Sequence, residues 1–363
     1  MLRTDGKLHY LREAPPKDAE TIEIAPGILW VRLPLPFRLN HVNVWLLREQ
    51  DGWTVVDTGA GTQQARELWE VLLKGVLAGS RINRVICTHG HTDHIGLAGW
   101  LVQRAGGAPF AATLVEWLSA QVRLSESQLP MRPEVVRFMQ GHGCDAPTIE
   151  AYRNDRRRTH ALLGEMPGTI ERLRDGATIT FGGRQWRILV CGGHTLEHAS
   201  FWCEGDNILI AGDQVLSKIS PMIGVYPGEP HADPLDEYLG SLRRFRELPA
   251  DALVLPSHGL PFVGLHTRLD QLQHHHELRL DHLARLMDEP RTTMELTHGL
   301  FPKAVAAGQG RHALAETIAH AHYLIGRGRA VRETTSDGRI LFRRAEDKEG
   351  EFIAADSCAP PKF

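Results

Sequence analysis

The stretch Thr88-His89-Gly90-His91-Thr92-Asp93-His94 places four potential metal ligands within six positions. It follows residues 84–87, a short apolar run that predicts a buried strand, and precedes a predicted helix that starts at Ile95. Histidines two positions apart in an extended chain point the same way, and Asp93 and His94 can face a second ion. The pattern therefore predicts two metals on a strand-to-helix loop, because a merely polar turn rarely collects four ligands.

This stretch resembles the H-x-H-x-D-H signature of the metallo-β-lactamase-fold hydrolases, a group that includes glyoxalase II-like enzymes. The family carries three further ligands, each after an apolar strand, and the sequence matches them in the family's order. They are His194 in Gly193-His194-Thr195, Asp213 after residues 207–212, and His258 after residues 252–257. The resemblance covers about residues 20 to 265 and implies an α/β fold with four αββα layers.

The resemblance also implies how the ligands divide. His89, His91 and His194 would hold one metal, Asp93, His94 and His258 the other, and Asp213 would bridge them. Imidazole and carboxylate donors without thiolate favour two zinc ions and leave iron or manganese open. A hydroxide bridging both metals would be the nucleophile, a metal would stabilise the oxyanion, and Asp93 would orient the hydroxide or return a proton.

Several residues near these motifs are expected to support the site. Asp57, in a strand-end turn, is interpreted as ordering the metal loop, with turn capping as the alternative. His198 repeats a histidine of the family pattern, but Leu196-Glu197 replaces the usual Pro-Gly, so His198 is interpreted as a neighbour of the ligands. The substrate contacts considered, each also explicable as ordinary loop surface, are Lys218, Tyr226 and His231.

Composition sets limits on the function. The 363 residues carry a formal charge of -3, which argues against a surface that coats nucleic acid generally. Five scattered cysteines without C-x-x-C spacing predict reduced thiols in a cytoplasmic protein. No apolar run approaches the roughly 20 residues that cross a bilayer, so no membrane partner is expected. The oligomeric state does not follow from the sequence.

Composition shifts divide the chain into four parts. Residues 1–19 form a polar, loosely held N-terminal arm, and residues 20–265 form the catalytic domain. Within it, residues of about 110–176 are interpreted as an inserted helical lid. Its arginines could grip a phosphate or carboxylate, but a solvated helix face is favoured. The basic positions are Arg153, Arg156, Arg157, Arg158, Arg172 and Arg174.

Residues 266–345 are expected to form a small unit of helices and a hairpin that resembles a winged-helix domain. A capped helix start is predicted at Thr292 with Glu295, and a hairpin turns at 336–338. Within a long predicted helix, residues 274–276 are three consecutive histidines, interpreted as a polar face because adjacent helix positions diverge. Residues 346–363 are interpreted as a polar, disordered tail.

The leading hypothesis is a dinuclear metal-dependent hydrolase acting on a small ester, thioester or lactone. The first alternative is a metal-dependent endoribonuclease or other nucleic-acid-processing enzyme, since the C-terminal unit is rich in arginine. Nucleic acid is thus a possible partner but not the favoured one. A further alternative, a non-catalytic ligand-sensing or scaffold module, is disfavoured by the complete ligand set.

Overall fold

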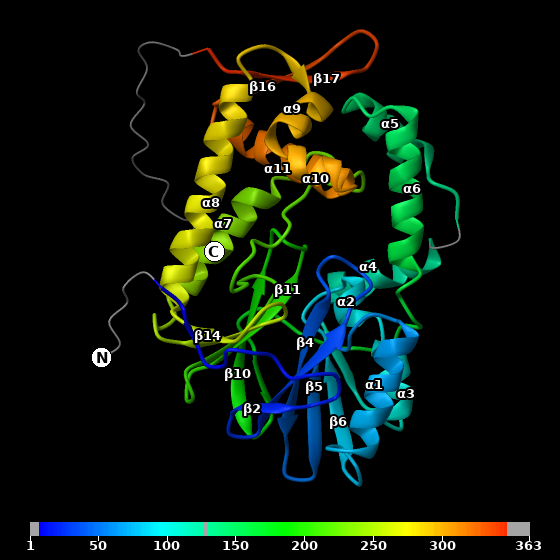
Figure 1. The fold of residues 1–363 in the computed structure, drawn as a ribbon, viewed down its shortest axis with the longest axis vertical. Helices are drawn as coiled ribbons and strands as arrows, with labels where there is room; N and C mark the ends of the chain where they lie inside the picture. The colour runs from blue at the N-terminus through cyan, green and yellow to red at the C-terminus, as the bar shows by residue number, and fades with distance from the viewer. Residues whose placement is uncertain (1–6, 127–128, 347–363) are drawn as a thin grey trace, which may run out of the picture.

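Along a single strand, successive side chains point to opposite faces of the sheet and so enter two different hydrophobic cores. Each sheet is therefore packed on both faces, which gives the fold its layers. A computed structural model describes residues 7–126 and 129–346 (Figure 1). In strand β3 (Ile28–Pro34), Ile28 and Trp30 enter the core between two sheets, whereas Leu29 and Val31 enter the core beneath the helices. Strand β10 (Arg184–Cys191) divides in the same way between the inner core and an outer core. The expected four-layer αββα arrangement is confirmed.

The first sheet has the order β2-β3-β4-β5-β6-β7-β8. Its early strands are antiparallel and those from β5 onward are parallel. The parallel part requires crossover connections, and helices supply most of them. The remaining strands are β2 (Ile22–Ala25), β4 (His41–Arg48), β5 (Gly52–Val56), β6 (Arg81–Ile86), β7 (Phe110–Ala112) and β8 (Glu171–Arg172), and the helices are α1 (Gln63–Lys74), α2 (Thr92–Ile95) and α3 (Ala98–Arg104).

The second sheet has the order β1-β14-β13-β12-β11-β10-β9. Only the pair β12 and β13 is parallel, and helix α7 lies between those two strands in the chain. Helices α7 and α8 cover the outer face of this sheet. The elements are β1 (His9–Tyr10), β9 (Thr178–Phe181), β11 (His198–Cys203), β12 (Ile208–Gly212), α7 (Pro234–Phe245), β13 (Leu253–Pro256), β14 (Phe262–Val263) and α8 (Leu265–Leu286).

The inserted segment contributes three helices, α4 (Leu114–Ser125), α5 (Pro133–Gly141) and α6 (Ala146–His160). The ends of the stretch expected to be a lid belong instead to the first sheet, as β7 and β8. Helices α5 and α6 pack against the C-terminal unit through a small core that includes Met139, Ile149 and Ile318. The helical segment therefore spans the distance between the catalytic layers and the C-terminal unit (Figure 1).

The C-terminal unit combines helices with a three-stranded sheet of order β15-β17-β16. The predicted capped start is confirmed, because Thr292 and Glu295 form a reciprocal capping box. Phe342 shares one core with Leu242 and Phe262, so the unit packs firmly on the catalytic layers. Its elements are β15 (Arg291–Thr292), α9 (Thr293–Leu300), α10 (Pro302–Ala306), α11 (Gly310–Gly326), β16 (Ala330–Thr334) and β17 (Ile340–Arg344).

Three local expectations differ from the structure. The helix expected from Ile95 starts at Thr92 and breaks near Leu97, whose backbone N–H donates to the carbonyl of Gly59. Part of the N-terminal arm is held, since β1 pairs with β14. His276 does not lie on a polar face: it is 0% exposed and bonds His320 across the helix interface.

The cysteines in the described part of the chain, Cys87, Cys144, Cys191 and Cys203, are buried free thiols. Cys358 and the tail from residue 347 lie outside the described residues. Among the described residues, no helix combines the length and the apolar character that crossing a membrane requires.

Candidate metal centre

The expected ligands lie at the ends of strands that come from both sheets. His89 and His91 follow β6, and α2 carries Asp93 and His94 directly behind them. From the second sheet, β10, β12 and β13 end just before His194, Asp213 and His258, respectively. Because the two sheets pack face to face, their strand ends deliver the seven side chains to one place.

The seven side chains form two adjoining groups. His89, His91, His194 and Asp213 offer ligand atoms that all lie within 4.8 Å of one another, and so do Asp93, His94 and His258. Asp213 lies between the groups: its Oδ2 is 3.3 Å from Nε2 of His194, and its Oδ1 is 3.3 Å from Nε2 of His258. This is the placement that a bridging carboxylate requires.

Three ligand histidines each form a hydrogen bond through Nδ1, which orients the other ring nitrogen, Nε2, toward the candidate metal centre. Nδ1 of His94 donates to Asp57 at 2.9 Å, Nδ1 of His194 to the Met222 carbonyl at 2.9 Å, and Nδ1 of His258 to the His41 carbonyl at 2.7 Å. Within the described residues, the Nε2 atoms of these three histidines are buried and have no hydrogen-bond partner. Buried nitrogens left with free lone pairs beside carboxylates fit a pair of divalent ions.

The pKa shifts of the ligand side chains also favour a bound cation at this centre. Burial lowers the pKa of His89 well below its ordinary value, and the nearby His94 and His91 lower it further. For His94, burial opposes protonation, but Asp93, Asp213 and Asp57 raise its pKa to about 10. Burial alone would raise the pKa of Asp213, yet His258 and His94 hold it well below its ordinary value. A cation bound at the centre would thus replace a proton that the carboxylates attract.

Asp57 and His198 lie beside the two groups rather than within them. The fully buried Asp57 accepts hydrogen bonds from His94 and, at 2.8 Å, from the backbone N–H of Thr88. Nε2 of His198 accepts the backbone N–H of Asp213 at 3.0 Å. Burial, with His194 nearby, lowers the pKa of His198 to about 3. Each therefore positions a ligand-bearing segment.

Two supporting residues were not identified from the sequence. Glu116 on α4 is 1% exposed and bonds both the loop of His89 and His91 and the loop of His194. His41, at the start of β4, accepts the backbone N–H of Gly259 and supplies the carbonyl that orients His258. The one available signal for Glu116 is a carboxylate flanked by apolar residues within a helical pattern.

None of the three expected substrate contacts is a member of the ligand groups, and each has a different neighbour. Lys218 is exposed, with its Nζ 5.9 Å from the Tyr10 ring centre. Tyr226 is on the same loop as Met222, and its hydroxyl is 3.7 Å from the Met222 sulfur. His231 is 3.3 Å from the guanidinium of Arg332, on the C-terminal sheet. Of the three, Tyr226 is on the segment that also orients His194.

Three of the six arginines named in the expected lid form ion pairs with acidic residues. Arg153, Arg156 and Arg158 form ion pairs with Glu150, Glu126 and Asp155, respectively. The exposed Arg158 agrees with the favoured interpretation of a solvated helix face, whereas the side chain of Arg156 is only 16% exposed.

Comparison with known proteins identifies the family. Residues 38–258 match the metallo-beta-lactamase superfamily, and residues 280–345 match the metallo-beta-lactamase-like C-terminal domain. A beta-lactamase domain protein from Burkholderia ambifaria is 36% identical, with 93% of this chain and 98% of that chain covered at a TM-score of 0.86.

Two curated relatives are more distant. The probable metallo-hydrolase YqjP of Bacillus subtilis is 27% identical over 81% of this chain and 90% of its own length. The atrochrysone carboxyl ACP thioesterase of Aspergillus fumigatus is 24% identical over 87% of this chain and 59% of its own length. Because a family model matches residues 38–258, a span that contains strands of both sheets and all seven candidate ligands, the chain belongs to the metallo-beta-lactamase superfamily.

Proposed function

We propose that the chain is a dinuclear metal-dependent hydrolase that cleaves a small ester, thioester or lactone. The observation that carries this proposal is the pair of ligand groups joined by Asp213, whose two oxygens lie toward different groups. Zinc is the proposed metal, because nitrogen and oxygen donors without thiolate suit it, and iron or manganese are the alternatives. Divalent ions held there would supply Lewis acidity and activation of water near neutral pH.

The roles proposed for the chain's own residues follow from their exposure. The side chain of Asp213 is 9% exposed, and Asp213 is proposed to hold the two halves of the site together. The side chain of Asp93 is 16% exposed, and its Oδ2 lies 3.5 Å from Nε2 of His258. As the more accessible carboxylate, Asp93 is proposed to orient the attacking water and to return a proton to the leaving group.

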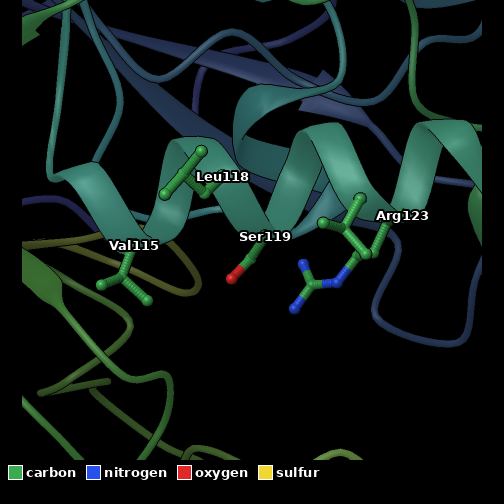
Figure 2. Close-up of a pocket in the computed structure, with 5 residues that line it drawn as sticks. Val115, Leu118, Ser119 and Arg123 are labelled. Atoms are coloured by element: carbon green, nitrogen blue, oxygen red, sulfur yellow. The ribbon is translucent and has the colours of Figure 1, made fainter.

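A hollow on α4 supports a small substrate with an apolar part. Figure 2 shows Val115, Leu118, Ser119 and Arg123 along α4, and the hollow that they line has a volume of about 350 Å³. The hollow is open and is lined by one helix, so it could contact the apolar part of a substrate on one side only. The hollow adjoins the metal loops, because Arg123 also donates a hydrogen bond to the Gly90 carbonyl. The thioesterase among the curated relatives favours a thioester as the first substrate to test.

The alternatives have less support. Arginines of the C-terminal unit, which suggested nucleic acid, form ion pairs with acidic residues: Arg327 with Asp236, Arg329 with Asp281, and Arg343 with Glu333. Such pairs reduce the positive field that would attract phosphates. A silent scaffold would not need seven gathered ligand side chains, three of them histidines oriented by separate hydrogen bonds.

The test is thiol release from a panel of acyl-CoA and acyl-glutathione thioesters by zinc-loaded protein, with labelled single-stranded RNA in the same tube. Chelator should abolish thiol release and zinc should restore it. Asp213→Ala should lower the rate by more than about 100-fold, whereas the exposed Asp206→Ala should leave it unchanged. RNA cleavage without thiol release would favour the nuclease. Inactivity on both would direct the search to lactones and other esters.

A further inference from the structure

Helix α4 contacts both ligand loops of the first metal group through one buried carboxylate. Oε2 of Glu116 accepts the backbone N–H of Gly90 at 2.8 Å, and Oε1 accepts the backbone N–H of Glu197 at 2.9 Å. Gly90 lies between His89 and His91, and Glu197 lies three positions after His194. A single side chain thus joins two loops that come from different sheets.

The same helix also holds the carbonyl ends of these two residues. Arg123 donates to the Gly90 carbonyl at 2.6 Å, and the Thr113 hydroxyl donates to the Glu197 carbonyl at 2.8 Å. Together, α4 and its N-cap residue Thr113 therefore bond both the backbone N–H and the carbonyl of Gly90 and of Glu197. These bonds fix the orientation of the peptide groups that flank them.

The close approach of α4 depends on the absence of a side chain at position 90. A Cβ on Gly90 would lie 2.6 Å from the backbone oxygen of Glu116 and 3.1 Å from its Oε2. Contacts this short are not tolerated against backbone, so the helix and the loop are matched in shape as well as in hydrogen bonding.

The second metal group is oriented by other residues. His94 bonds Asp57, and His258 bonds the carbonyl of His41. Neither Asp57 nor His41 belongs to α4. Asp57 also accepts the backbone N–H of Thr88, beside His89, so its support reaches the loop that both groups share. The contacts of Glu116, in contrast, are confined to the segments that carry His89, His91 and His194.

We propose that Glu116 is a positioning residue that sets the separation of the His89/His91 loop from the His194 loop, and so controls the affinity of the first metal group alone. This rests on the metal centre of the proposed function but not on the hydrolysis. Residues that orient ligands typically change metal affinity by about 10- to 100-fold.

The variant Glu116→Gln distinguishes the hydrogen bonds of Glu116 from the space that its side chain fills. Glutamine keeps the shape, but its amide can accept only one of the two N–H groups and turns an NH₂ toward the other. One buried donor is then left unsatisfied. Glu150→Gln is the matched control, because Glu150 is an exposed residue of α6 that pairs with Arg153.

The measurement is calorimetric titration of chelator-treated protein with zinc, with cobalt absorption spectra as a second readout. We expect Glu116→Gln to bind one zinc equivalent about 10- to 100-fold more weakly and the other as the unaltered chain does. The cobalt bands should change for one equivalent only. Glu150→Gln should match the unaltered chain in both readouts.

Unchanged binding of both equivalents in Glu116→Gln, or equal weakening of both, would overturn the proposal. If Glu116→Gln does not fold, Thr113→Val decides, because it removes only the hydroxyl that bonds Glu197. Weakening of one equivalent would then support the proposal, and unchanged binding would overturn it. A chain that binds two zinc ions but hydrolyses nothing would contradict the proposed function and leave this proposal standing.

Discussion

Asp57 accepts a hydrogen bond from Nδ1 of His94 at 2.9 Å, and both side chains are fully buried. The bond fixes the ring so that Nε2 points toward Asp93 and Asp213. Asp57 also has a φ of +65°, in the left-handed region that asparagine tolerates. Asp57→Asn should therefore keep the backbone while weakening the orientation of His94.

We expect Asp57→Asn to lose zinc about 10- to 100-fold more readily than the unaltered chain, as measured by metal content after dialysis against a graded competitor. Asp206→Asn is the control, because it makes the same change at an exposed carboxylate that pairs with Arg184. It should retain both zinc and activity. Equal zinc retention in Asp57→Asn and the unaltered chain would contradict the orienting role.

Gly90→Ala tests how closely α4 packs against the loop of His89 and His91. The quantity measured is the stability of the metal-free protein, not its affinity for metal. The added Cβ would meet the backbone oxygen of Glu116 at 2.6 Å. Overpacking of this kind costs about 1–3 kcal/mol. Denaturant unfolding of the metal-free protein should reveal that loss. Gly205→Ala is the control and should change stability little, because its Cβ would meet nothing within 4 Å. A similar loss of stability in both variants would argue against close packing of α4 on the loop at Gly90.

The ligand loops could be predicted from the sequence because the family resemblance supplied the motifs to search for and each apolar strand run ends just before its ligand. Glu116 could not, because its two partners lie 26 and 81 positions away and only folding brings them together. His276 was misinterpreted for the same reason: its partner His320 is 44 positions away on another helix. Local periodicity determines where strands and helices form, whereas the partners of a buried polar group depend on tertiary packing.

The buried pair His276 and His320 predicts an acid-sensitive stability. Nδ1 of His276 lies 3.1 Å from Nε2 of His320, and both residues are 0% exposed. Burial lowers the pKa of His320 to about 3, and burial together with His320 lowers the pKa of His276 to about 2. As pH falls below about 6.5, the unfolded chain takes up these protons first, so the folded state loses stability.

The loss should approach about 1.4 kcal/mol per pH unit for each histidine. Melting temperatures of chelator-treated protein between pH 7.5 and 5.0 should therefore fall less steeply in the double variant His276→Leu and His320→Leu. Removing both partners leaves neither ring unpaired. His274→Leu, at an exposed position of the same helix, should keep the original slope. Parallel curves for the double variant and the unaltered chain would refute the assignment.

Leu118 tests whether the hollow on α4 receives the apolar part of a substrate. The residue is 45% exposed and lines the hollow, so its truncation should affect binding more than folding. Burial of one methylene contributes about 0.8 kcal/mol, and a partial contact should lower kcat/KM of Leu118→Ala for a long-chain thioester by about 3- to 10-fold. An acetyl thioester, which cannot reach along α4, should be hydrolysed at the original rate. Leu278→Ala, at a 57% exposed position on α8, should alter neither substrate. A loss independent of chain length would mean that Leu118 acts through the metal loops and that the apolar part of the substrate lies elsewhere.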